Sequence, residues 1–81
     1  MKLDIRLFGP LAEAAGHARL ELDLDEGATV RDVLAEASRR APELGSLLGT
    51  VAVAVNRRYA AEDSAVAAGD EVALIPPVSG G

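Results

Sequence analysis

The stretch Gly69-Asp70-Glu71-Val72-Ala73-Leu74-Ile75-Pro76-Pro77 contains the strand on which the expected fold depends. Gly69 and Asp70 are typical turn residues, and Val72 and Leu74 fall on one face of an extended segment over residues 71–75. The two prolines end this strand, because proline cannot donate a hydrogen bond to a ladder. We expect the segment to lie at the centre of a sheet, parallel to the first strand of the chain.

The first strand is predicted over residues 2–8, where apolar and charged residues alternate. Gly9 and Pro10 end it. A short helix is predicted over residues 11–15, with Pro10 at its first position and Gly16 as its stop signal. A second alternating segment, residues 18–24, is predicted to pair with the first strand in the antiparallel sense, because the connection between them is short.

A longer helix is predicted to begin after Thr29, a good N-cap that has Asp32 three residues later, as in a capping box. Its apolar stripe has helical spacing and comprises Val30, Val33, Leu34 and Ala37. Pro42 prevents its continuation. After it we expect core-filling leucines at positions 44, 47 and 48, a central strand over 51–55, a turn at 56–58 and a short edge segment over 59–62.

This order of elements predicts an α+β fold, a β-grasp (ubiquitin-like) roll with a mixed sheet and one main helix packed on one face. The predicted domain spans residues 1–77. Residues 78–81 form a predicted flexible tail, because nothing after Pro77 has an expected ladder partner.

Composition excludes several classes of site. The chain has 81 residues, enough for one domain, with 49% hydrophobic residues and no cysteine. Disulfides, iron–sulfur clusters and thiolate zinc sites are therefore excluded, and a single histidine, His17, cannot build a zinc site. A net charge of −5 with only 2% aromatic residues argues against nucleic acid as a partner. We expect a cytoplasmic protein that is not bound to a membrane, because no apolar run approaches the roughly 20 residues of a membrane span.

Few residues suggest catalysis within the chain. The acids Asp4, Asp23, Asp25 and Glu26 alternate with apolar residues or crowd a turn, as solvated acids do, so we do not expect a metal site there. The serines have no histidine and aspartate partners placed by the sequence, so a self-contained enzyme is not expected.

The remaining chemical feature is the end of the chain, Val78-Ser79-Gly80-Gly81. A terminal carboxylate is ionised and unreactive at neutral pH, and it becomes an electrophile only when a partner activates it, for instance as an acyl-adenylate. Glycines lack a Cβ, so a partner's walls could close around the backbone. These residues favour a carrier whose reactive group is its own C-terminus, and the simpler alternative is a frayed glycine end.

Three segments resemble the MoaD family of ubiquitin-like sulfur carriers, the small subunits of molybdopterin synthase: residues 7–16, 53–56 and, most specifically, 69–81. The resemblance implies that an E1-like enzyme uses ATP to adenylate Gly81, which then becomes a thiocarboxylate with sulfur from a donor protein. It also implies that the tail enters a large catalytic subunit, in an expected heterotetramer, and gives sulfur to a pterin precursor. This chain would bind no cofactor or metal itself.

The resemblance assigns roles to individual positions. Gly81 would bear the sulfur or the adenylate. Gly80 and Ser79 would keep the tail narrow enough to enter a partner's active site. The residues expected to contact partners, with core packing as the alternative, are Phe8, Leu74, Ile75, Pro76, Pro77 and Val78. Three other functions stay open: a thiazole-pathway (thiamine) sulfur carrier, a ubiquitin-like protein modifier that forms isopeptide conjugates, and a β-grasp binding module with an idle tail.

Overall fold

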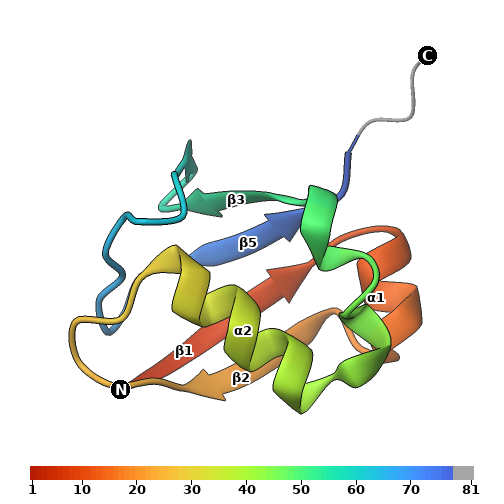
Figure 1. Cartoon of the computed structure of the whole chain (residues 1–81), viewed down its shortest axis with the longest axis horizontal. Helices are drawn as coiled ribbons and strands as arrows, with labels where there is room; N and C mark the ends of the chain where they lie inside the picture. The colour runs from red at the N-terminus through yellow and green to blue at the C-terminus, as the bar shows by residue number, and fades with distance from the viewer. Residues whose placement is uncertain (78–81) are drawn as a thin grey trace.

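The computed structural model describes residues 1–77. Its elements are β1 (Lys2–Leu7), α1 (Pro10–Ala15), β2 (Arg19–Asp23), α2 (Val30–Arg40), the 3₁₀ helices η1 (Pro42–Leu44) and η2 (Leu48–Thr50), β3 (Ala52–Val55), β4 (Arg58–Tyr59) and β5 (Val72–Ile75). The five strands form one sheet in the order β2-β1-β5-β3-β4, and α2 crosses one face of it (Figure 1).

The pairing at the centre of the sheet agrees with the prediction. β1 and β5 are parallel, with Ile5 opposite Val72 and Leu7 opposite Leu74. The other pairs are antiparallel: β2 beside β1, and β3 between β5 and β4. The predicted α+β roll of the β-grasp type, a mixed sheet with one main helix, is therefore confirmed.

The core lies between the sheet and α2. Val33 and Ala37 of α2 are both 0% exposed, as are Ile5 and Val72 on the facing strands. The start of α2 is fixed by the expected pair, because the Asp32 carboxylate accepts hydrogen bonds from the Thr29 backbone N–H at 2.9 Å and from its hydroxyl at 3.2 Å. Removing this much apolar surface from water is the main force that holds a domain without disulfides together.

Most predicted elements differ from the observed ones by a residue at an end, and two of these differences have a clear local reason. β1 ends at Leu7 instead of Phe8, because the chain turns at Gly9, whose φ is 54°. The edge strand is Arg58–Tyr59 instead of 59–62, because Asn56 and Arg57 both have positive φ, 53° and 68°, and form a two-residue hairpin turn. The expected core-filling leucines lie in and between η1 and η2, and Leu44 is fully buried.

In residues 1–77 no helix is long and apolar enough to cross a bilayer. The predicted tail, residues 78–81, lies outside the described residues, and so do the site residues predicted at Val78, Ser79, Gly80 and Gly81.

Candidate docking surface beside the C-terminal segment

The face of the sheet opposite α2 is divided into two halves. On β1 and β2 the outward side chains are charged, and they include the cross-strand ion pair in which Arg19 lies 3.2 Å from Asp4. The alternation of the strands places the charges on this face, since the residues between them, such as Ile5 and Leu22, are buried under α2. This half is a solvated surface, as the sequence predicts.

The other half, over β5, β3 and β4, is apolar. We call it the sheet patch and define it by Phe8, Ala54, Tyr59, Ala73 and Ile75, which line a shallow hollow of about 300 Å³ together with Arg57 and Glu71. The floor is made of small residues, because Ala54 of β3 pairs with Ala73 of β5. Phe8 and Tyr59 rise beside this floor with exposed fractions of 47% and 77%, and they are the large hydrophobic residues that the described part of the chain exposes.

An exposed aromatic pair over an alanine floor is typical of a protein–protein contact surface. Phenylalanine and tyrosine supply much of the binding energy in such interfaces. The hollow is open and its rim is polar, since the Arg57 guanidinium lies 3.8 Å from the Glu71 carboxylate. This arrangement can receive apolar side chains of a partner.

The predicted contact residues within residues 1–77 divide into one that is buried in the core and four that are at least partly exposed. Leu74 is 0% exposed and pairs with Leu7 and Val53 in the core, which corrects the expectation that it contacts partners. The reason is the two-residue period of a strand, which turns Leu74 toward α2 and its neighbour Ile75 toward the open face. Phe8 and Pro77 are exposed and Ile75 and Pro76 are half-buried, so they remain predicted contacts.

Three members of the patch, Ala54, Tyr59 and Ala73, are missed by sequence reasoning. Tyr59 is expected only as an edge residue, and the two alanines only as residues of strands. The available signal is the small side chain of an alanine at an outward position of each of two predicted strands, which leaves room beside larger neighbours.

A hydrogen-bond network secures the far end of β5 to the β3–β4 hairpin. The Asn56 side-chain amide donates to Asp70 at 3.0 Å, and its oxygen accepts from the Glu71 backbone N–H at 3.0 Å. The Ala67 backbone N–H donates to the same Asp70 carboxylate at 2.8 Å. The two hydrogen bonds that the Asp70 carboxylate accepts hold its pKa below the usual value of 3.8, and the bond from Asn56 has the larger effect. The network keeps β3 and β5, and hence the alanine floor, in register.

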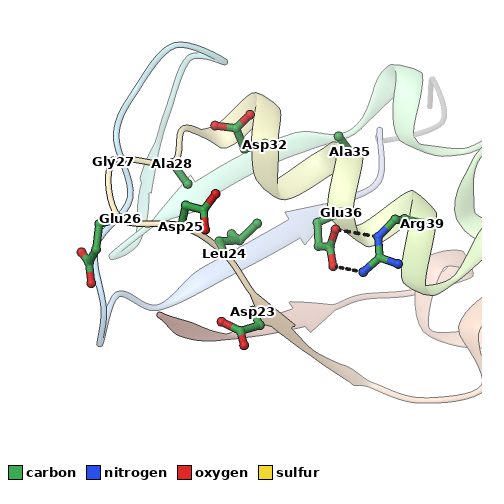
Figure 2. A pocket seen from close by; sticks show the side chains of 10 residues that line it. All are labelled: Asp23, Leu24, Asp25, Glu26, Gly27, Ala28, Asp32, Ala35, Glu36 and Arg39. Carbon is green, nitrogen blue, oxygen red and sulfur yellow. Dashed lines mark hydrogen bonds and ion pairs between the residues drawn. The ribbon is translucent and has the colours of Figure 1, made fainter.

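A second hollow lies elsewhere in the described part of the chain. It measures about 470 Å³, lies between α2 and the loop that follows β2, and is lined mainly by acidic side chains (Figure 2). In Figure 2 the carboxylates of Asp23, Glu26 and Asp32 point in different directions, and Glu36 is bound to Arg39. That hydrogen bond from Arg39 lowers the pKa of Glu36.

This acidic hollow is not a candidate metal site. Among residues 1–77 no group of three or more histidine, aspartate or glutamate side chains is placed to hold an ion. The loop after β2, which lines this hollow, lies at the end of the sheet opposite the end of β5, where the chain exits toward Pro76 and Pro77 (Figure 1). The sheet patch, which adjoins that exit, is therefore the better candidate.

Comparison with known proteins places the chain in a family. The model of the ThiS family matches residues 5–81. Small archaeal modifier protein 1 of Haloferax volcanii is 42% identical, over 98% of this chain and 100% of that protein. Its crystal structure superposes with a TM-score of 0.92 at 39% identity and covers 100% of both chains. The molybdopterin synthase sulfur carrier subunit of Chlamydomonas reinhardtii is 36% identical over 100% of both chains.

These matches extend over nearly the whole chain, so they concern the complete β-grasp domain rather than an isolated motif. The predicted resemblance to MoaD-like sulfur carriers is confirmed. The chain thus belongs to the ThiS family.

Proposed function

We propose that this protein is the sulfur carrier subunit of a molybdopterin synthase, acting in the cytoplasm with Gly81 as its reactive residue. One observation carries the proposal: an apolar surface with two exposed aromatic residues adjoins the exit of a segment that ends in Gly80-Gly81. Similar proteins named as molybdopterin synthase sulfur carrier subunits support it. They also support a non-catalytic role for this chain within the complex.

The chemistry requires activation from outside. A carboxylate oxygen of Gly81 attacks the α-phosphorus of ATP on an E1-like enzyme, and pyrophosphate leaves. A donor protein then delivers sulfur at the oxidation level of sulfide, which attacks the acyl carbon and displaces AMP, so that a C–S bond replaces a C–O bond. The sulfur of the resulting thiocarboxylate bonds to a carbon of a pterin precursor held by the large catalytic subunit, and water then hydrolyses the C–S bond at Gly81 and restores its carboxylate. The chain forms a heterotetramer with this large subunit.

The length of the tail links this chemistry to the sheet patch. Residues 78–81 span at most about 14 Å when fully extended. An enzyme that acts on the Gly81 carboxylate must therefore bring its active site within that distance of Pro77. Such an enzyme covers the surface around Pro77, which includes Phe8 and Ile75 of the sheet patch.

The test is reconstitution. The chain is incubated with the E1-like enzyme, ATP, a sulfur donor, the large subunit and the pterin precursor, and dithiolene formation is measured. We expect product with the parent chain and none after deletion of Gly81 or addition of one residue beyond it, while both variants keep the parental melting temperature. Product from the truncated chain would overturn the proposal.

A second candidate function is protein modification through an isopeptide bond. The observation in its favour is the similarity to small archaeal modifier protein 1 over the whole chain. The same activation mixture distinguishes the two functions when cell lysate replaces the large subunit. Covalent conjugates between Gly81 and lysines of lysate proteins, together with no dithiolene in the complete mixture that contains the large subunit, would favour the modifier.

A further inference from the structure

Arg6 is an exposed cation at the border of the sheet patch. It lies on β1 opposite Ala73 of β5, which belongs to the alanine floor. The alternation of the strand places its side chain on the open face, since its neighbours Ile5 and Leu7 are buried under α2. Among residues 1–77 the Arg6 guanidinium forms no ion pair. Within this part of the chain, an unpaired positive charge thus borders an exposed apolar surface.

The register of β1 and β2 explains why Arg6 is unpaired. Arg6 lies directly opposite Arg19, and Asp4 lies directly opposite Glu21, so two rungs of like charge follow each other. One diagonal between these rungs is closed, because the Arg19 guanidinium lies 3.2 Å from the Asp4 carboxylate. Like charges directly opposite each other destabilise a sheet. The stability of the strand pair therefore gives no reason for an arginine at position 6.

The chemistry of the side chain indicates what Arg6 can bind. A guanidinium is planar and can donate two parallel hydrogen bonds to one carboxylate, and arginine is enriched among the residues that contribute most to protein interfaces. The chain as a whole carries a net charge of −5. A partner carboxylate is thus repelled by most of this protein and attracted at Arg6, which favours one orientation of docking.

We propose that Arg6 binds a carboxylate of the large subunit, so that the docking surface consists of the sheet patch and one charged contact beside it. The inference rests on the proposed function for the identity of this partner. It specifies the partner's surface, which presents apolar side chains to the hollow and an aspartate or glutamate next to them. Such a carboxylate would supply the second negative charge of the Arg6–Arg19 rung, of which Asp4 supplies the first.

The binding test compares Arg6→Gln with Arg40→Gln. Arg40 is the last residue of α2, on the other layer of the fold, and it is exposed and forms no ion pair with another of the residues 1–77. Both substitutions therefore change the net charge equally, but only one removes the cation beside the sheet patch. Surface plasmon resonance measures the Kd for the large subunit at about 0.05 M and about 0.5 M salt.

We expect Arg6→Gln to raise the Kd about tenfold at the lower salt concentration and by less at the higher one, because salt screens an ion pair at the rim of an interface. Arg40→Gln should stay within about threefold of the parent. An unchanged Kd in Arg6→Gln, or an equal rise in both variants, would overturn the proposal. Failure of the parent chain to bind the large subunit would overturn it together with the proposed function.

A cross-linking test identifies the carboxylate itself. Lys2 is the one lysine of the sequence, so Arg6→Lys adds a single new amine whose products are easily located. A carbodiimide joins an amine to a carboxylate only when the two are in direct contact. We expect fragmentation to show an amide between position 6 and an aspartate or glutamate of the large subunit. No such amide in the assembled complex, or an equal yield from position 40 of Arg40→Lys, would contradict the proposal.

These readouts do not depend on sulfur transfer. An amide at position 6 in a complex that makes no dithiolene would support the contact and refute the carrier function, whereas dithiolene formation with a parental Kd for Arg6→Gln would do the reverse. Thermal denaturation checks the role of Arg6 in the fold. Because Arg6 faces Arg19, Arg6→Gln should melt at or slightly above the parental temperature. A clear decrease would assign Arg6 to the stability of the sheet and overturn the proposal.

Discussion

Replacement of Phe8 by alanine should weaken binding to the large subunit without unfolding the chain. Phe8 follows β1 at the edge of the sheet patch, and 47% of it is exposed. A phenylalanine of roughly 200 Å² thus leaves about 90 Å² for a partner to cover. At about 25 cal/mol per Å², this area contributes about 2 kcal/mol, which corresponds to an approximately 30-fold increase in Kd.

The assay is isothermal titration of the large subunit with parent and Phe8→Ala chains, and circular dichroism checks the fold. Arg31→Ala is the control, because it truncates a long, exposed side chain on α2, the layer opposite the sheet patch, and removes only a surface ion pair at 3.5 Å. We expect a Kd close to the parental value for the control. A folded Phe8→Ala chain that binds within about threefold of the parent would refute the assignment of the patch as the docking surface.

Three further predictions concern the fold. Val53→Asp should lower the free energy of unfolding by on the order of 4 kcal/mol, because it places a charge at a position that is 5% exposed. The control Ala52→Asp, on the open face of the sheet, should cost far less. Urea denaturation measures both variants, and equal losses of unfolding free energy would contradict the register of β3. Asp70→Ala should destabilise the chain more at pH 7 than at low pH. The lowered pKa of Asp70 means that its contribution is complete above the usual value of 3.8 and is lost as the pH falls through the folded-state pKa, so a pH-independent difference in unfolding free energy would argue against the network with Asn56. Arg57→Gly should raise the free energy of unfolding by about 0.5 kcal/mol, because glycine suits a φ of 68° and the ion pair lost with Glu71 is long and exposed. Thermal denaturation measures the change, and a melting temperature below that of the parent would count against the hairpin geometry.

Much of the fold can be predicted because its signals are local. The alternation in residues 2–7 determines which side chains of β1 are buried, and the pair Thr29 and Asp32 marks the start of α2. Pro76 marks the end of β5 for the simple reason that it has no N–H. In each case a few neighbouring residues contain the whole physical reason.

The sheet patch could not be predicted in the same way, because it depends on contacts between distant segments. Tyr59 joins it only because the turn at Asn56 and Arg57 folds β4 back onto β3. Leu74 leaves the predicted contact set because its strand is placed under α2, whereas Ile75, one residue later, faces outward. Registers of this kind are fixed by tertiary packing and not by the local sequence.

The most direct test of the account is the intact mass of the chain after incubation with the E1-like enzyme, ATP and a sulfur donor, followed by fragmentation to locate the change. The account predicts a mass increase equal to the exchange of one oxygen for one sulfur, located at Gly81 and dependent on ATP. A chain whose mass does not change in an activation mixture that is competent for a known carrier, or one that gains sulfur after Gly81 has been removed, would contradict it.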